Sequence, residues 1–332
     1  EIAGLGWPAA VLPEAHGGLG IGYKGLGAVF EQIGRTLAAT PLLSTVVLGG
    51  GLLSEAGSEA QRDHWLPKIA AGEALLALAL EEEPRHDPTR VALRAWRESD
   101  HWWLDGDKQF VLDGHVAHRL IVVARSSGVP GQPTGLSMFL VDPAAPGVQV
   151  ERRWMVDSRN AASVRLSRVR VDEDALVGAP DQAFAVLDRV LDRARMCVAA
   201  ELLGVVSEAF ERTVAYLKER VQFDVVIGSF QALQHRAARL YVEIELLRSC
   251  LAAALESADA GEGGAAELAS LAKARASDLG ERALNEAVQM HGGVGITDAF
   301  DIGLFLKRAR VLQQTLGDGA CHRDRYARLR GF

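Results

Sequence analysis

The sequence predicts a mainly helical protein with a central β domain, and three observations support this fold class. Helix-like segments fill residues 1–74 and residues 178–332 of the 332-residue chain. Between them, residues 75–177 alternate short apolar or β-branched runs with turn signals. One apolar stripe with 3-4 spacing marks a long helix in the second half. We therefore predict an N-terminal helical domain, an antiparallel β-barrel or sandwich, and a C-terminal helical bundle, with these boundaries.

The N-terminal domain is predicted to hold two helices, around Gly25–Ala38 and Ser58–Ala71, and Pro41 starts a third candidate helix. Residues 12–20 are rich in glycine and read as a turn-rich loop.

The middle domain is predicted to consist of many short strands, which is typical of a small barrel or sandwich. Turns are expected at Asp105-Gly106 and Asp113-Gly114. The candidate strands are Val91–Trp96, Trp102–Leu104, Gln109–Leu112, Leu120–Ala124, Ser137–Val141, Val148–Glu151, Ser163–Leu166 and Val169–Val171.

The C-terminal domain has the clearest periodicity. The stripe comprises Phe230, Leu233, Ala237, Leu240, Ile244, Leu247 and Leu251. This spacing puts seven apolar side chains on one face of a helix. Further long helices are expected within Gln182–Arg220, Ala265–His291 and Phe300–Gln314, so the domain should be a bundle.

Composition argues against several classes of protein. The net charge is −7, and nucleic-acid binding is not expected because phosphate neutralisation needs a basic surface. The longest apolar runs, Pro41–Leu53 and Leu75–Leu80, are shorter than the roughly 20 residues of a membrane helix.

The three cysteines are scattered, which predicts reduced thiols in a cytoplasmic protein, and no metal site is predicted. No signal peptide is visible, and the first residue is Glu1, as expected of a chain whose true N-terminus is missing.

Two motifs in the C-terminal domain could bind a ligand. The first is Gln289-Met290-His291-Gly292-Gly293-Val294-Gly295, where a long helix should end. It is either a glycine helix cap or a backbone turn that presents N–H groups to an anion. In the second, Arg220 and Phe223 end one helix, and Gln231 begins the next. Here the alternatives are a surface arginine with a core phenylalanine, or an arginine that pairs with a phosphate.

Together these motifs resemble the acyl-CoA dehydrogenase family, whose members read R-x-x-F-G, I-x-x-x-Q and Q-x-x-G-G-x-G in this order. Further matches are Leu12-Pro13-Glu14 with Gly17-Gly18, the segment Glu31–Arg35, and Gly106-Asp107-Lys108. The resemblance covers nearly the whole chain. It implies N-terminal helices, a β domain and a four-helix bundle, and it implies FAD-dependent α,β-dehydrogenation of an acyl-CoA thioester.

In this family the β domain of one subunit contacts the flavin ring, and the bundle of a neighbouring subunit contacts the rest of FAD. The residues matching the family's bundle contacts are Arg220, Phe223, Gln231, Gln289, Gly292 and Gly293. The one departure is Asp224, where the family has glycine.

The β-domain half departs from the family pattern. The family's T-E-P-x-x-G-S-D loop is replaced by Glu82-Glu83-Pro84-Arg85-His86-Asp87-Pro88-Thr89. Leu112 stands in place of a threonine whose hydroxyl would contact the flavin, and leucine has no donor to offer.

The catalytic base of the family is a glutamate at one of two positions. Alignment with the family puts Gly317 at one position and Ala194 at the other, and neither can accept a proton. Asp318 is the nearest carboxylate. It is interpreted as the N-cap of a final helix, with a surrogate base as the alternative. His322, at helical spacing from Asp318, is expected to be a surface histidine.

Three hypotheses follow, because the chain keeps the family's bundle contacts but lacks its flavin loop and its catalytic glutamate. The first is a base-lacking subunit of a heteromeric α2β2 acyl-CoA dehydrogenase in lipid metabolism, in fatty-acid or steroid degradation. Its partners would be a related subunit, acyl-CoA and electron-transfer flavoprotein. The second is a self-sufficient homotetrameric dehydrogenase or oxidase that uses Asp318. The third is a non-enzymatic scaffold subunit.

Overall fold

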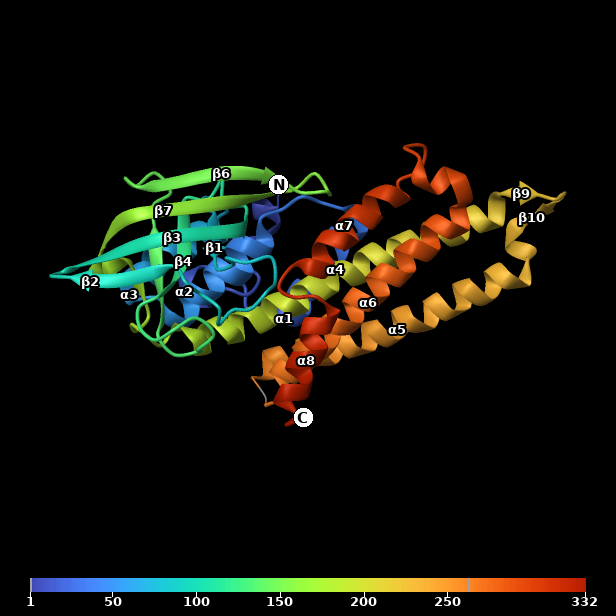
Figure 1. Ribbon diagram of the computed structural model, residues 1–332. Coiled ribbons are helices and arrows are strands. Elements are labelled where there is room, and N and C mark those ends of the chain that lie inside the picture. Colours follow the sequence, from blue (N-terminus) through green and yellow to red (C-terminus); the bar gives the residue numbers. More distant parts are fainter. Residues whose placement is uncertain (1, 262) are drawn as a thin grey trace. The chain divides into compact units, whose positions relative to one another are not determined.

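The computed structural model describes residues 2–261 and 263–332 and shows two compact units (Figure 1). The β unit comprises the residues up to Gly22 together with Thr40–Ala194, and the helical unit comprises Tyr23–Ala39 and Arg195–Phe332. Helix α4 (Ala183–Glu219) contributes to both units because the boundary lies within it. Within the described ranges, no helix combines the length and apolarity that a membrane crossing requires.

Short helices open the β unit. They are 3-10 turns at Ala3–Leu5, Trp7–Ala9 and Glu14–His16, the π-helix η4 (Leu42–Gly50), α2 (Gly51–Ala56) and α3 (Glu59–Ala70). A capping box begins α3, because the Ser58 hydroxyl accepts the Gln61 N–H and the Gln61 side chain accepts the Ser58 N–H. The helix expected at Ser58–Ala71 is thus confirmed. The helix expected after Pro41 begins as a fully buried π-helix, a form that apolar periodicity does not reveal.

One sheet forms the middle of the β unit. Its strand order is β6-β7-β3-β2-β4-β5-β8, and β1 pairs with β4. The strands are β1 (Leu76–Ala79), β2 (Arg94–Glu98), β3 (His101–Leu112), β4 (Arg119–Arg125), β5 (Leu136–Val141), β6 (Val148–Trp154), β7 (Asn160–Asp172) and β8 (Leu176–Val177). The pairings of β4 with β1 and β2 are parallel and the others are antiparallel, so the sheet is mixed where the sequence predicted an antiparallel one.

The predicted strands Trp102–Leu104 and Gln109–Leu112 are one continuous strand, β3. The Asp105-Gly106 pair, expected as a turn, lies inside this strand, and the register with β7 shifts between Leu104 and Gly106. Gly106 has a φ of +143°, which glycine adopts readily. The turn signal therefore marks a bulge in the strand.

The helical unit consists of long helices joined by short connections. They are α1 (Gly22–Thr36), the rest of α4, α5 (Gln231–Ala260), α6 (Ala265–His291), α7 (Ile302–Gln314) and α8 (Gly319–Leu329). A hairpin of β9 (Val221–Gln222) and β10 (Val225–Val226) connects α4 to α5. The predicted stripe on α5 is buried only from Leu240 to Leu251, and its first residue, Phe230, is 38% exposed.

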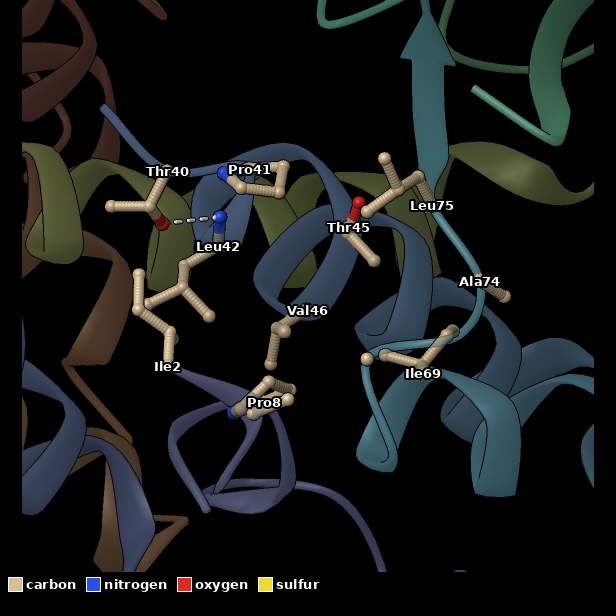
Figure 2. A pocket seen from close by; sticks show the side chains of 12 residues that line it. Ile2, Pro8, Thr40, Pro41, Leu42, Thr45, Val46, Ile69, Ala74 and Leu75 are labelled. Atoms are coloured by element: carbon tan, nitrogen blue, oxygen red, sulfur yellow. Dashed lines mark hydrogen bonds between the residues drawn. The ribbon is translucent and has the colours of Figure 1, made fainter. Parts of the chain in front are cut away.

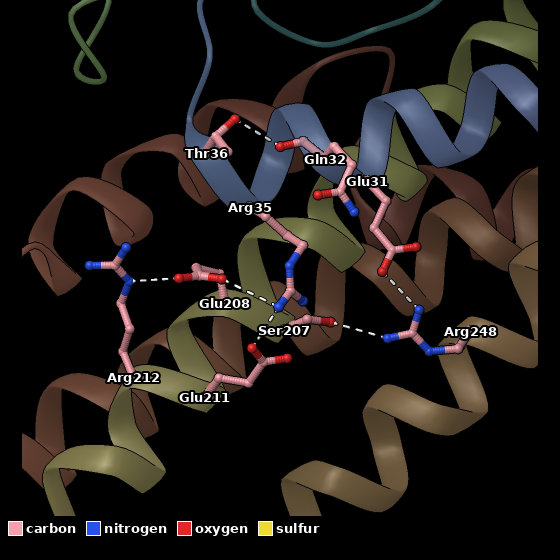
Figure 3. Close-up of polar contacts among 9 residues, drawn as sticks. All are labelled: Glu31, Gln32, Arg35, Thr36, Ser207, Glu208, Glu211, Arg212 and Arg248. Carbon is pink, nitrogen blue, oxygen red and sulfur yellow. Dashed lines mark hydrogen bonds and ion pairs between the residues drawn. The ribbon is translucent and has the colours of Figure 1, made fainter.

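Ion pairs join α1 to α4 and α5 within the helical unit (Figure 3). An Arg35 guanidinium nitrogen lies 2.5 Å from a Glu211 carboxylate oxygen, and Arg248 lies 2.8 Å from Glu31. The segment Glu31–Arg35, which matches the family pattern, therefore supplies a charged residue to each pair. These contacts are partly exposed, so each contributes modestly to stability.

Candidate functional site

The six residues that match the family's bundle contacts lie at the ends of helices in the helical unit. We call them the bundle set: Arg220, Phe223, Gln231, Gln289, Gly292 and Gly293. Arg220 directly follows α4, Phe223 forms the hairpin turn, and Gln231 is the first residue of α5. Gln289 lies in the last turn of α6, and the two glycines follow it.

A cavity of about 520 Å³ lies beside part of this set. Its lining residues are Arg212, Ala215, Tyr216, Glu219, Arg220, His291, Ala299, Phe300, Asp301 and Ile302. The cavity thus joins the end of α4 to the segment that surrounds Gly292. The sequence did not single out Tyr216 or Phe300, and no motif connects them. Their contact is set by how α4 packs beside the loop after α6.

The polar side chains of the bundle set make no hydrogen bond or ion pair with any residue in the described ranges. This holds for Arg220, Gln231 and Gln289, all of which are exposed. Other arginines near them are paired, as Arg212 is with Glu208 and Asp301, and Arg236 is with Glu286. Arg220 therefore presents beside the cavity a guanidinium that has no ion pair within the described residues.

The glycines of the bundle set form an open turn. Gly292 has φ +67° and ψ −148°, a region of backbone conformation that is essentially restricted to glycine. Its N–H also bonds the Gln289 carbonyl and ends α6, so the helix-cap interpretation is confirmed. A Cβ atom built on Gly293 would meet nothing within 4 Å. Packing in this chain therefore does not require glycine at 293.

Of the alternative that paired a surface arginine with a core phenylalanine, the surface position of Arg220 is confirmed and the core position of Phe223 is wrong. Phe223 is 85% exposed, and its ring forms a T-shaped pair with that of Phe230, with ring centroids 6.1 Å apart. The reason is the hairpin: Phe223 and Asp224 form its two-residue turn with φ of +56° and +63°. A bulky residue in this left-handed region is strained, and the turn points its ring away from the helices.

Asp224→Gly is expected to stabilise the β9–β10 hairpin by up to about 1 kcal/mol, because glycine adopts a positive φ without strain. Amide hydrogen exchange of Val225 and Val226 measures this locally. Their exchange should slow in the variant, while exchange in the middle of α5 should stay unchanged. Faster exchange of the hairpin would contradict the strain assigned to Asp224.

The loop that replaces the family's flavin-binding loop is bonded to its own unit. The Glu82 carboxylate accepts the Ala92 N–H at 2.7 Å and the Leu93 N–H at 3.0 Å. It also lies 2.7 Å from the Lys108 ammonium. Burial lowers the pKa of Lys108 to about 8, an effect that Glu82 opposes. His86 is largely buried and lies 2.6 Å from Glu81.

The two positions predicted for the family's glutamate hold Ala194 and Gly317, and neither residue has a carboxylate. Ala194 is fully buried within α4, and Gly317 has a φ of +100°. The Asp318 carboxylate accepts the Cys321 N–H at 2.8 Å, which confirms its interpretation as the N-cap of α8.

The expectation that His322 lies on the surface is wrong: the side chain is fully buried, and its Nε2 lies 2.8 Å from the Leu316 carbonyl oxygen. Helical spacing from Asp318 could not reveal that α8 turns this face inward.

A buried lysine holds the segment around Gly317. The Lys273 ammonium donates to the carbonyls of Gln313 at 3.0 Å and Gly317 at 2.6 Å, and to the Ser277 hydroxyl at 3.1 Å. It thus caps the C-terminal carbonyls of α7. Burial lowers the pKa of Lys273 to about 7, and Arg195 adds to this effect.

Lys273→Met is expected to remove a pH dependence of stability. The pKa of Lys273 is about 7 in the folded chain and 10.5 ordinarily, so between these values only the unfolded chain keeps the proton. The free energy of unfolding therefore rises with pH across this window in the wild type. Urea unfolding at pH 7 and pH 9 measures this rise, which should shrink in Lys273→Met and persist in the exposed control Lys218→Met. The same rise in both variants would contradict the assignment.

A second cavity, of about 500 Å³, lies in the β unit (Figure 2). The lining comprises Ile2, Ala3, Pro8, Thr40, Pro41, Leu42, Thr45, Val46, Ile69, Gly72, Ala74 and Leu75. None of the described residues that line it is charged. Thr40 Oγ1 accepts the Leu42 N–H, and Thr45 Oγ1 bonds both the N–H and the carbonyl of Leu76. The cavity is therefore an apolar space.

Comparisons with known proteins cover nearly the whole chain. Three profiles of one family match in order: acyl-CoA dehydrogenase N-terminal domain at residues 1–73, middle domain at 77–172 and C-terminal domain at 182–329. Acyl-CoA dehydrogenase FadE12 of Mycobacterium tuberculosis is 32% identical over 321 residues, which is 94% of this chain and 81% of that protein.

Solved structures agree with these matches. A variant of the Tcur3481-Tcur3483 steroid ACAD is 34% identical, with a TM-score of 0.88 over 99% of this chain and 86% of that chain. The ChsE4-ChsE5 complex from Mycobacterium tuberculosis is 28% identical, with a TM-score of 0.89 over 100% of this chain and 87% of that chain. The chain therefore belongs to the acyl-CoA dehydrogenase family, whose members are FAD-dependent oxidoreductases that act on the CH–CH group of acyl-CoA.

Proposed function

We propose that this chain is a base-lacking subunit of a hetero-oligomeric acyl-CoA dehydrogenase and that it completes the FAD site of a related partner subunit. The observation that carries this proposal is the contrast between the chain's bundle contacts and its β-domain contacts for FAD. The side chains of Arg220, Gln231 and Gln289 are exposed and make no hydrogen bond or ion pair with a described residue, whereas Glu82 of the loop that replaces the flavin loop is bonded to the rest of its own unit.

The bundle set fits the anionic part of FAD. A pyrophosphate needs cationic and N–H donors, and Arg220 offers a guanidinium that no carboxylate of the described residues neutralises. The backbone at Gly292 and the open space over Gly293 allow a close approach of a ligand to the main chain. The amide side chains of Gln231 and Gln289 are available as further donors. These residues would hold the cofactor on this side of the shared site.

The β-domain half fits the flavin ring poorly. Leu112 offers no hydroxyl, and a flavin atom left without its partner would cost about 1–3 kcal/mol. The Glu82 carboxylate, at the first position of the replaced loop, is held by Lys108 and two backbone N–H groups. This side of the chain therefore supports no flavin site of its own.

The proton of the substrate α carbon needs a carboxylate within hydrogen-bond reach. Gly317 and Ala194 offer none, and Asp318 is bonded to the start of α8. The base is therefore assigned to the partner subunit. When bound, FAD supplies the acceptor for the hydride of the β carbon.

Two of the similar structures carry double names, Tcur3481-Tcur3483 and ChsE4-ChsE5, as expected of assemblies of two different proteins. The first is named as a steroid ACAD, an acyl-CoA dehydrogenase. By this analogy we assign bulky CoA thioesters, such as those with sterol side chains, to the assembly. Electron-transfer flavoprotein is the acceptor that a dehydrogenase of this family would use.

Reconstitution tests the proposal. The purified chain, incubated with FAD, should retain no flavin after gel filtration and should not oxidise acyl-CoA. Addition of the partner subunit should restore both flavin retention and turnover. Oxidation of acyl-CoA by the chain alone would contradict the proposal, and loss of that activity in Asp318→Asn would then identify Asp318 as the base.

A further inference from the structure

Three side chains form a row that begins on the last turns of α4 and ends on Arg220, the residue directly after the helix. Arg212, Tyr216 and Arg220 are spaced by four residues, which places them one above another on a helix. All three line the 520 Å³ cavity. They differ in their partners. The side chains of Arg212 and Tyr216 bond the segment after α6, whereas the Arg220 side chain makes no hydrogen bond or ion pair with a described residue.

Tyr216 holds the beginning of that segment. Its hydroxyl donates to the His291 carbonyl at 3.3 Å, and this carbonyl belongs to the peptide group that joins His291 to Gly292. The two rings are stacked, with centroids 4.4 Å apart and planes at 22°. The His291 ring is itself fixed, since its Nδ1 lies 2.8 Å from the Ala287 carbonyl oxygen. The peptide group before the glycine turn is therefore tied to α4.

Arg212 holds the other end of the segment. Its guanidinium lies 3.0 Å from the Asp301 carboxylate and 3.0 Å from Glu208. The adjacent Phe300 places its ring edge-on to Tyr216 and to His291, with centroids 5.4 Å away in both cases. The segment 292–301, which we call the glycine loop, is thus anchored at both ends to one face of α4.

We propose that Tyr216 is a positioning residue for the FAD site. Its hydroxyl fixes the glycine loop at a set distance from Arg220, so that the guanidinium and the loop backbone meet the same phosphate group. Tyr216 does not touch the reacting atoms. It acts on cofactor affinity, through the shape of the loop, and this role rests on the proposed function of the bundle set. A loop fixed before binding loses less conformational freedom when the ligand arrives.

The test is Tyr216→Phe in the assembly of this chain with its partner. The variant keeps the aromatic stack and removes one hydrogen bond. After the flavin is removed, titration with FAD and flavin fluorescence give the Kd, which should rise by about 2- to 13-fold. The melting temperature of the chain without flavin should change little. Tyr241→Phe is the matched control, because Tyr241 is 56% exposed and its hydroxyl has no partner within the described residues.

A double-mutant cycle separates positioning from general stability. If Tyr216 acts by placing the loop against Arg220, Tyr216→Phe should change the Kd less in an Arg220→Ala background than in the wild type. An unchanged Kd in Tyr216→Phe, or the same fold-change in both backgrounds, would overturn the inference. A lower melting temperature with an unchanged Kd would assign Tyr216 a structural role only.

The same experiment distinguishes this inference from the proposed function. If Arg220→Ala raises the Kd for FAD and Tyr216→Phe leaves it unchanged, only the positioning role fails. If Arg220→Ala itself leaves the FAD affinity of the assembly unchanged, the bundle set does not hold the cofactor and the proposed function fails.

Discussion

Gly204→Ala is expected to destabilise the helical unit by about 1–3 kcal/mol, the usual effect of overpacking a tight contact. Gly204 lies in α4, and a Cβ atom built there would sit 2.0 Å from the Glu31 carbonyl oxygen of α1. The reciprocal glycine, Gly34 of α1, would place a Cβ 2.0 Å from the Glu201 carbonyl oxygen. Both obstacles are backbone atoms, which cannot rotate away, so the two helices would have to separate.

Separation of these helices would also stretch the ion pair between Arg35 of α1 and Glu211 of α4 (Figure 3). Urea unfolding of Gly204→Ala should show a lower midpoint. Gly303→Ala is the matched control, since a Cβ atom there would meet nothing within 4 Å and alanine favours a helix over glycine by up to about 1 kcal/mol. The two variants should therefore shift the midpoint in opposite directions. Equal midpoints for Gly204→Ala and the wild type would contradict the close crossing of α1 and α4.

Arg220→Ala is expected to raise the Kd for FAD of the assembled enzyme by about 10- to 150-fold, the range for loss of a hydrogen bond to a charged group. Arg220 is exposed and has no ion pair within the described residues, so its removal leaves no carboxylate of this chain without a partner. The fold of the free chain should therefore be unaffected. Flavin fluorescence measures the Kd, and thermal unfolding of the free chain measures the fold.

The matched control is Arg330→Ala, an equally exposed arginine beyond the end of α8 that likewise has no ion pair in the described ranges. This control should retain the wild-type Kd. An equal loss of affinity in both variants would indicate a general effect of positive charge. No loss in Arg220→Ala would support the scaffold hypothesis, in which the fold serves assembly alone.

Local signals in the sequence predicted most of the helices well. The Asp318 cap lies where its residue type indicated, because a cap depends on residues within one turn. The fold class was predictable for the same reason, since helical and strand periodicities differ along the chain.

Features that depend on contacts between distant segments were not predictable. The Asp105-Gly106 pair looks like a turn, and only its pairing with β7 makes it a bulge. His322 is buried because α8 packs one face inward, which one histidine cannot signal.

In the candidate site, too, the residues were predictable from the sequence but their contacts with distant segments were not. The sequence identified the members of the bundle set through a resemblance to a family pattern, residue by residue. It could not show that Tyr216 meets His291, since 75 residues separate them. It also could not show that Glu82 bonds Lys108 and the Ala92 N–H, because that bonding depends on how the loop folds against β3.

The central claim is that this chain donates one half of a FAD site and lacks the other half. Native mass spectrometry of the assembly, purified through a tag on this chain, tests it most directly by counting subunits and flavins. We predict two kinds of subunit in equal numbers and one FAD for each partner subunit, with none for this chain. An assembly of this chain alone that carries one FAD per subunit would contradict the account.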